Sequence, residues 1–204
     1  MKNNKIAKYL LEIKAVKLSP NNPFTWASGI KSPIYCDNRK TLSYPKVRKY
    51  ITGEFVKQIK REFPDVEVIA GVATGAIALG VLISDEMNLP FIYVRSSSKG
   101  HGLQNKIEGF VEKGKKIVVI EDLISTGGSS IEAIKALRQA ETNVLGLSAI
   151  FTYGFKKAID NFKNVDCKFF TLSNYEVLIE EALKSNYIKK EDFKILEEWK
   201  LDKN

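Results

Sequence analysis

Two adjacent acids and a run of hydroxyl and glycine residues lie close together in the middle of the chain. Glu121 and Asp122 follow the β-branched run 117–120, and Ser-Thr-Gly-Gly-Ser-Ser at 125–130 leads into a helical pattern. A loop between a buried strand and a helix N-terminus offers free backbone N–H groups to an anion. Glycines let the backbone approach a phosphate, and carboxylates suit ribose hydroxyls or magnesium. The stretch therefore predicts a site for a phosphorylated sugar.

The same loop excludes two common nucleotide sites. It contains neither Gly-x-x-x-x-Gly-Lys nor Gly-x-Gly-x-x-Gly, so neither a triphosphate P-loop nor a dinucleotide fingerprint is supported. The plain alternative is a strand-to-helix turn whose Ser and Gly residues only cap the helix. The full stretch of apolar strand, two acids, two apolar residues and Ser-Thr-Gly-Gly resembles the phosphoribosyl-pyrophosphate (PRPP) motif of the type I phosphoribosyltransferases.

Composition limits the classes of function. The chain has 204 residues, which suits one domain, and a formal charge of +8 that is scattered rather than in basic blocks. This pattern favours a small anionic ligand over nucleic acid. Two cysteines in unrelated contexts give neither a metal site nor a disulfide framework, so a cytoplasmic setting is the default. The longest uncharged run, 68–84, is too short and too rich in glycine and alanine to predict a membrane span.

Alternating strands and helices position these residues. Apolar runs predict strands at 66–70, 91–94, 117–120, 144–151 and 168–171. Helical periodicity predicts helices near 6–13, from Pro45 to about Pro64, from the Gly71-Val-Ala-Thr-Gly75 turn to Met87, over 129–140, 175–184 and 191–199. We expect an α/β fold, an open and mainly parallel sheet flanked by helices. The site then lies at the carboxyl ends of the strands.

The segment 20–45 carries a second set of candidate residues. It holds four of the six prolines and reads Phe-Thr-Trp-Ala-Ser-Gly-Ile-Lys-Ser-Pro-Ile-Tyr-Cys-Asp-Asn-Arg over 24–39. Such a stretch disfavours regular helix, while its aromatic residues need burial or a ligand to cover them. This sequence resembles the hood of the orotate phosphoribosyltransferase family, which covers the pyrimidine base. The alternative is a purely structural aromatic cluster.

A polar loop over 95–109 completes the candidate site. It has few apolar residues before Ile107 and contains His101, the single histidine of the chain. A lone histidine on a loop is usually only solvated. Lys99 and His101, two residues apart and after Arg95, resemble the Lys-x-His-Gly pattern of the orotate family's flexible loop. Cationic groups on a closing loop could neutralise departing pyrophosphate.

The resemblance spans nearly the whole chain and implies an activity. It implies transfer of the 5-phosphoribosyl group from PRPP to orotate, giving orotidine 5′-monophosphate and pyrophosphate in UMP biosynthesis, with Mg²⁺ as cofactor. It also implies a homodimer in which loop 95–109 acts across subunits, and no nucleic-acid or membrane partner. The predicted organisation is one domain, 1–204, with an N-terminal helix and hood at about 1–45 and a core at about 46–204.

The resemblance also assigns roles to residues. The catalytic candidates are Lys99, His101 and Asp122, with Asp122 also a candidate magnesium ligand. Residues expected to bind PRPP are Arg95, Lys99, His101, Glu121, Asp122, Leu123, Ile124, Ser125, Thr126, Gly127, Gly128, Ser129 and Thr74, which lies in the turn 71–75 expected to contact pyrophosphate. That turn could instead be a glycine turn needed for packing. Residues expected to bind orotate are Ser125, Lys31, Tyr35 and Tyr153.

The chain departs from the enterobacterial branch of the family at several positions. Ala27 and Ser96 stand where that branch has lysine, Thr74 stands where a Tyr-Lys pair begins, and Tyr153 replaces an arginine that contacts orotate. The hood sequence is more similar to that of a second, Gram-positive-like branch of the family. Two rival functions share the acid-pair loop: a phosphoribosyltransferase for another base, and a non-catalytic PRPP-sensing regulator. The hood and the Lys-x-His pattern favour the orotate enzyme over both.

Overall fold

A six-stranded sheet forms the centre of the computed structural model, which describes residues 4–26, 29–96 and 106–203. Its strand order is β10-β9-β8-β5-β6-β7. Neighbouring strands are parallel, except that β7 pairs with β6 in the antiparallel sense. The strands are β5 (Val68–Val72), β6 (Phe91–Val94), β7 (Ile107–Glu108), β8 (Lys116–Ile124), β9 (Asn143–Thr152) and β10 (Phe169–Asn174). The predicted mainly parallel sheet is confirmed.

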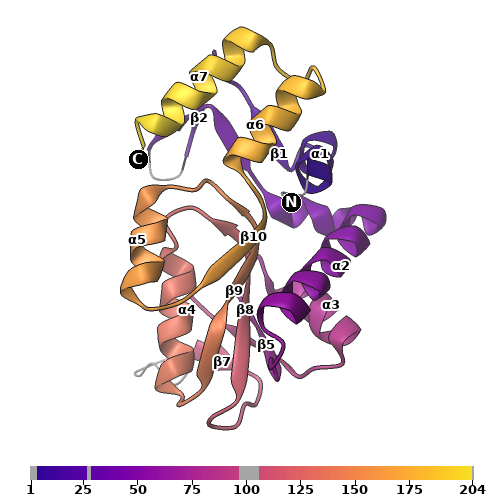
Figure 1. Cartoon of the computed structure of the whole chain (residues 1–204), viewed down its shortest axis with the longest axis vertical. Helices are drawn as coiled ribbons and strands as arrows, with labels where there is room; N and C mark the ends of the chain where they lie inside the picture. The colour runs from indigo at the N-terminus through magenta and orange to yellow at the C-terminus, as the bar shows by residue number, and fades with distance from the viewer. Residues whose placement is uncertain (1–3, 27–28, 97–105, 204) are drawn as a thin grey trace.

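Helices cover both faces of this sheet. Alternate side chains of β8 enter two separate hydrophobic clusters: Val118 and Ile120 pack in one, Ile117 and Val119 in the other. The first cluster includes residues of α2 and α3, and the second includes residues of α4 and α5, which lie on opposite sides of the sheet (Figure 1). Burial on both faces explains why the central strands are apolar without alternation. These helices are α2 (Pro45–Glu62), α3 (Ile77–Met87), α4 (Gly128–Gln139) and α5 (Lys156–Asn164).

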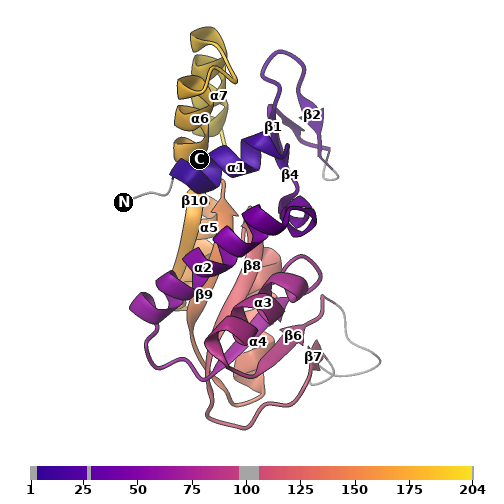
Figure 2. The ribbon, with the colours of Figure 1, turned by 90° about the vertical axis from the view of Figure 1, so that its right-hand side faces the viewer.

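A second layer of structure lies beyond the carboxyl ends of the strands. The hood contains two short antiparallel pairs and a 3₁₀ helix, and it lies beside α1, α6 and α7 at one end of the molecule (Figures 1 and 2). Trp199 of α7 donates a hydrogen bond from Nε1 to the Lys31 carbonyl at 3.4 Å, which ties the C-terminal helix to the hood. The elements are α1 (Asn4–Glu12), β1 (Val16–Leu18), β2 (Phe24–Thr25), β3 (Lys31–Ser32), β4 (Ile34–Cys36), η1 (Asn38–Ser43), α6 (Tyr175–Lys184) and α7 (Lys190–Leu201).

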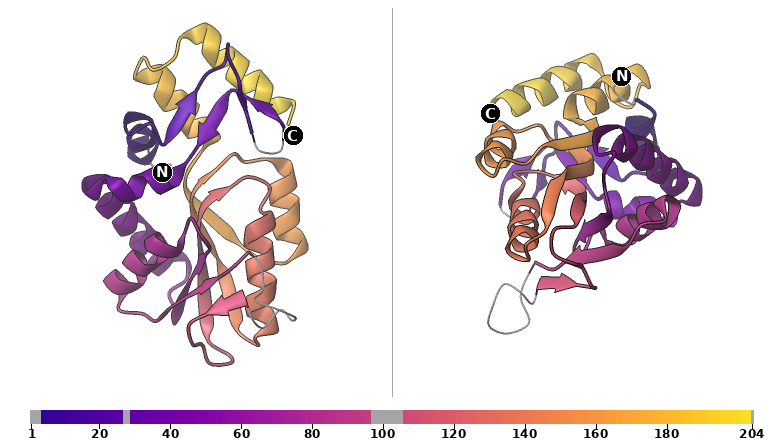
Figure 3. Two further views of the ribbon diagram at one scale, coloured as in Figure 1. Left: turned by 180° about the vertical axis from the view of Figure 1, so that it is seen from behind. Right: turned by 60° about the horizontal axis from the view of Figure 1, so that its bottom comes forward.

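The structure corrects the predicted end of one strand and adds two elements that were not predicted. The strand predicted to end at 120 continues to Ile124, because β8 stays paired with β9 as far as Thr152. The polar segment 95–109 ends in β7, which pairs with β6. The helix α5 was not predicted, and it lies beside the N-terminal part of α4 (Figure 3).

Candidate active site

Three neighbouring cavities lie at the carboxyl ends of the central strands, and two of them are also lined by hood residues. We call them the hood cavity, the acid-pair cavity and the Arg95 cavity, with volumes of about 230, 310 and 420 Å³. The first two share Cys36 and Leu123, and the last two share Ala73 and Thr74. The cavities therefore form one track past the ends of β8 and β5.

The acid pair lies within the last part of β8 rather than in the loop after it. Glu121 pairs in register with Ala149 of β9, and its side chain is buried with 4% of its surface exposed. Ser130 and Ser129 of α4 donate hydroxyl hydrogen bonds to its Oε2 at 2.9 and 3.3 Å. Glu121 thus joins the end of β8 to the first turn of α4.

Burial gives Glu121 an unusual acidity. Removal from water, together with the neighbouring Asp122 charge, raises the pKa of the Glu121 carboxyl from 4.5 to about 8. The Ser130 hydroxyl and the Asp122 N–H oppose this rise by hydrogen-bonding to the carboxylate. The buried carboxyl is therefore largely protonated near neutral pH in the ligand-free protein.

Asp122 is the more open member of the pair. It is half-buried and lines the acid-pair cavity opposite the turn after β5. A Cβ on Gly75 would lie 2.6 Å from the Asp122 carboxyl carbon, so only glycine lets this turn approach the acid so closely. Burial raises the pKa of Asp122, while hydrogen bonding with Glu121 and the charge of Arg39 act in the opposite direction.

The predicted phosphate loop connects β8 to the N-terminus of α4. Gly127 is the N-cap residue with φ of +81°, and the first turn of α4 contains no acidic residue. The first N–H groups of a helix have no acceptor within the helix, so this end can bind an anion. Thr126 and Ser129 are exposed, and Ser125 is half-buried. Hydroxyls and backbone donors therefore lie together at this helix end, and their binding of a phosphate stays a prediction.

The helix α5 holds this loop in place. Asn161 donates a hydrogen bond from Nδ2 to the Thr126 carbonyl at 3.0 Å. A Cβ on Gly127 would lie 2.7 Å from the ring of Phe162, which is 1% exposed. The loop thus depends on two residues of an element that the sequence pattern did not indicate.

Two residues of the predicted PRPP set differ in their surroundings. Leu123 is half-buried and lines both the hood cavity and the acid-pair cavity. Ile124 is fully buried, and its carbonyl accepts a hydrogen bond from the Tyr153 N–H at 3.2 Å. The side chain of Ile124 therefore belongs to the core, which leaves only its backbone near the loop.

Aromatic residues form the walls of the hood cavity. Trp26 and Tyr153 pack with ring centroids 5.2 Å apart, and Tyr35 lines the same cavity. Trp26 donates a hydrogen bond from Nε1 to the Ile34 carbonyl at 3.0 Å, which fixes the indole. Burial raises the pKa of the Tyr153 phenol, so this hydroxyl stays neutral. Such an aromatic, mainly apolar cavity suits a planar ring.

Four of the predicted orotate residues can be placed. Ser125, Tyr35 and Tyr153 line the hood cavity, and their binding of orotate stays a prediction. Lys31 lies on β3 with an exposed side chain and does not line any of the three cavities. The structure therefore brings three of the four together and leaves Lys31 apart.

Arg95 and Thr74 meet in the third cavity. Arg95 donates a hydrogen bond from Nη1 to Glu108 Oε1 at 3.2 Å, and this pair is only partly exposed. Lys99 and His101, both predicted to act on pyrophosphate, lie outside the described residues, as does Ala27. Ser96 is exposed and lines the Arg95 cavity.

Sequence reasoning did not select two hood residues that reach the acid pair. Asn38 is 1% exposed; it donates from Nδ2 to the Asp122 carbonyl at 2.6 Å and accepts from the Cys36 thiol at 3.3 Å. Arg39 lines the acid-pair cavity. In the sequence, both residues belong to the Asp-Asn-Arg segment that ends the hood motif.

The acid-pair cavity fits a magnesium ion that arrives with its substrate. Within the described part of the chain, no group of three or more His, Cys, Asp and Glu side chains could hold a metal by itself. Magnesium usually keeps several waters and binds through one or two carboxylates plus substrate phosphates. Asp122, half-buried at the cavity wall, can supply one such carboxylate.

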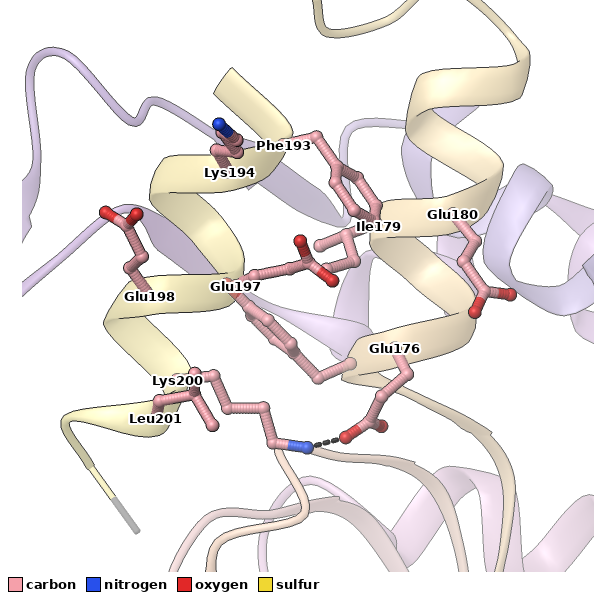
Figure 4. Close-up of a pocket in the computed structure, with 10 residues that line it drawn as sticks. Glu176, Ile179, Glu180, Phe193, Lys194, Glu197, Glu198, Lys200 and Leu201 are labelled. Atoms are coloured by element: carbon pink, nitrogen blue, oxygen red, sulfur yellow. Dashed lines mark ion pairs between the residues drawn. The ribbon is translucent and has the colours of Figure 1, made fainter. Parts of the chain in front are cut away.

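A further hollow of about 480 Å³ lies between α6 and α7, and it contains none of the predicted site residues (Figure 4). Its lining includes Glu176, Glu180, Glu197 and Glu198, and Lys200 forms an ion pair with Glu176. An acidic wall repels an anionic substrate, so the track of three cavities is the better candidate. None of the helices in the described ranges is long and apolar enough to span a membrane.

The sequence and the fold of this chain are similar to those of known proteins. A family model described as a phosphoribosyl transferase domain matches residues 43–185. The orotate phosphoribosyltransferase of Porphyromonas gingivalis is 56% identical over 195 residues, covering 96% of this chain and 93% of the relative. That of Staphylococcus aureus is 57% identical over 195 residues, covering 96% of each. A crystal structure of orotate phosphoribosyltransferase from Aeropyrum pernix has the same fold, with a TM-score of 0.79 and 24% identity over 90% of this chain and 99% of that one.

Proposed function

The chain belongs to the phosphoribosyl transferase domain family, and from this premise we propose that it transfers the 5-phosphoribosyl group of PRPP to orotate. The products are orotidine 5′-monophosphate and pyrophosphate, so the enzyme is a pentosyl-transferring glycosyltransferase of pyrimidine biosynthesis. The supporting observation is the identity of 56 and 57% to orotate phosphoribosyltransferases over 96% of the chain. Because these matches cover 96% of the chain, they include most of the hood. The family model begins at residue 43 and does not include it.

The track of cavities suggests how PRPP lies. Its 5′-phosphate binds the N–H groups and hydroxyls from Ser125 to Ser129 at the start of α4. Its ribose hydroxyls face Asp122, with Glu121 buried behind and held by the α4 serines. Its pyrophosphate extends over Thr74 toward Arg95. This orientation directs C1′ toward the hood cavity, where the base binds.

Orotate occupies the hood cavity in this arrangement. Trp26, Tyr35 and Tyr153 provide a flat apolar surface for the pyrimidine ring, and Ser125 provides a hydroxyl near the ribose end. The hood cavity and the acid-pair cavity share Cys36 and Leu123, so base and ribose lie in adjacent spaces. A ring nitrogen can then approach C1′ directly.

The transfer proceeds without a protein nucleophile. As the C1′–O bond to pyrophosphate breaks, C1′ gains oxocarbenium character, and the orotate nitrogen donates its electron pair to form the C1′–N bond while its N–H proton passes to the leaving pyrophosphate. Positioning and charge stabilisation therefore supply most of the rate enhancement. Lys99 and His101 neutralise or protonate the leaving pyrophosphate. Asp122 would help to hold a magnesium ion that arrives with PRPP, and that ion would supply positive charge to offset the phosphates.

The remaining assignments rest on the family resemblance. The chain acts as one domain with a hood at about 1–45, works as a homodimer in the cytoplasm, and extends loop 95–109 toward the partner subunit's site. The Arg95 cavity, where that loop begins, opens on the pyrophosphate end of the track. A dimer with shared sites predicts that mixing two inactive variants, one in the loop and one in the acid pair, restores partial activity.

Orotate absorbance provides the first test of this function. Purified protein with PRPP and Mg²⁺ is expected to consume orotate, and omission of either PRPP or Mg²⁺ is expected to stop consumption. The Asp122→Asn variant serves as the site control and should lose most turnover. Tight PRPP binding without consumption of any base would favour the rival regulator and overturn the proposal.

A further inference from the structure

The turn after β5 separates two cavities that each contain one arginine. Ala73 and Thr74 line both the acid-pair cavity and the Arg95 cavity. Arg95, at the end of β6, lines the one, and Arg39, in η1 of the hood, lines the other. A ligand that lies over Thr74 would therefore meet guanidinium groups from two elements far apart in sequence.

Each of these arginines is oriented by one carboxylate. Arg39 donates from Nε to Asp37 Oδ1 at 2.7 Å, just as Arg95 donates from Nη1 to Glu108 Oε1 at 3.2 Å. A guanidinium has five N–H donors, so one such bond leaves donors for a ligand. The Arg39 side chain is 61% exposed, which makes it accessible to a ligand in the cavity.

The charge of the acid-pair cavity makes Arg39 important. Its lining contains three acids, Asp37, Glu121 and Asp122, and Arg39 is the single cation among the described residues that line it. The turn itself, Ala73-Thr-Gly75, carries no charged side chain. A pyrophosphate group that enters this cavity needs a cation to offset the carboxylates, and no other described lining residue supplies one.

We propose that Arg39 of the hood binds the pyrophosphate group of PRPP, on the side of Thr74 opposite Arg95. This inference rests on the proposed function, which gives the track a pyrophosphate ligand. Arg39 lines the cavity that holds Thr74 and Asp122 and does not line the hood cavity, so it faces PRPP rather than the base. Of the PRPP groups there, the anionic pyrophosphate over Thr74 is the one that a guanidinium binds most strongly. The hood then binds both substrates: its aromatic residues hold the base, and Arg39 holds the leaving group.

A matched pair of variants tests the proposal. Arg61 on α2 also donates from Nε to a neighbouring carboxylate, Glu62, at 2.7 Å, and its side chain is 67% exposed, but it lines none of the three cavities. Arg39→Ala and Arg61→Ala therefore remove similar surface ion pairs, and only the first lies in the track. The binding of inorganic pyrophosphate and of PRPP, each with Mg²⁺ and without base, is measured by calorimetry.

Arg39→Ala is expected to weaken both ligands by about 10- to 100-fold, the usual loss for a charge-assisted hydrogen bond. Arg61→Ala should leave both affinities within about twofold of wild type. In steady-state assays, Arg39→Ala should raise the KM for PRPP and leave that for orotate nearly unchanged. Arg39→Lys, which keeps the charge, should recover part of the affinity and covers the case in which the alanine variant unfolds.

The outcomes separate this inference from the function beneath it. If wild-type protein consumes orotate while Arg39→Ala binds pyrophosphate as tightly as wild type, the role of Arg39 is refuted and the function stands. A rise in the orotate KM alone would also refute it, since Arg39 would then serve the base. If wild type binds pyrophosphate but consumes no base, and Arg39→Ala loses that binding, the proposed function fails while the role of Arg39 stands.

Discussion

Gly127 and Gly128 are adjacent in the phosphate loop, yet the structure predicts different effects when each becomes alanine: loss of stability at Gly127 and loss of PRPP binding at Gly128. Gly127 has φ of +81°, and a Cβ there would lie 2.7 Å from the Phe162 ring. A left-handed conformation costs an alanine about 1–2 kcal/mol, and overpacking against a buried ring adds about 1–3 kcal/mol. Gly127→Ala should therefore lower the free energy of unfolding by about 2–5 kcal/mol.

Gly128 provides the control within the same loop. It is the first residue of α4, and a Cβ there would meet no atom within 4 Å. Gly128→Ala should change the free energy of unfolding by less than about 1 kcal/mol, because alanine is at least as good a helix former. The new methyl group would enter the open space assigned to the 5′-phosphate. Gly128→Ala should therefore weaken PRPP binding while leaving the fold intact.

Urea unfolding and PRPP calorimetry on the two variants measure these effects separately. A Gly127→Ala protein as stable as wild type would show that Phe162 does not constrain the loop. A Gly128→Ala protein that binds PRPP as tightly as wild type would show that the phosphate does not lie at this helix end. Equal destabilisation by both changes would contradict the distinction drawn from the loop geometry.

Three further outcomes follow from the same site. With its pKa raised to about 8, the Glu121 carboxyl holds a proton that the unfolded chain releases near 4.5, so the ligand-free fold loses stability as pH rises through this window. In urea titrations, the free energy of unfolding of Glu121→Gln should therefore rise relative to that of wild type as the pH increases from 5 to 9, by a few kcal/mol at most. A difference between the two proteins that stays constant with pH would contradict the raised pKa of Glu121. Lys99→Ala should lower kcat strongly while leaving the melting temperature of the protein nearly unchanged. Loss of the melting transition in this variant would count against a purely catalytic role. Asn38→Ala removes the partner of the partly buried Asp122 carbonyl and Cys36 thiol, so the free energy of unfolding should fall by about 1–3 kcal/mol and the KM values for both substrates should rise. Unchanged KM values would show that Asn38 does not link the hood to the acid pair.

The central sheet could be predicted because its strands are buried on both faces. Runs such as 117–120 are apolar without alternation, and the glycine turns after them mark the carboxyl edge. The extension of β8 through Glu121 and Asp122 could not be predicted, since polar residues end an apolar run in the sequence. Their strand geometry depends on pairing with β9, which is a long-range contact.

The support of the phosphate loop was also hidden in the sequence. Within α5, Ala158 and Phe162 are the buried residues, so its apolar pattern is sparse. Its role comes from Asn161 and Phe162 contacting Thr126 and Gly127, which no local pattern indicates.

The hood shows the same limit of sequence reasoning. Its aromatic residues were recognised by their types, and Tyr35 lines a cavity as expected. Asn38 and Arg39 lie at the end of the hood sequence, where the motif assigned them no role, and only the fold brings them to Asp122. Lys31, chosen by resemblance, lies outside the track because β3 directs it to the surface.

The choice of base tests the account most directly. A single reaction containing orotate, adenine, hypoxanthine and uracil at equal concentrations, with PRPP and Mg²⁺, is followed by chromatography of the nucleotide products. The account predicts orotidine 5′-monophosphate as the dominant product, together with an equal amount of pyrophosphate. A purine nucleotide or uridine 5′-monophosphate in its place would show that the hood cavity binds a different base.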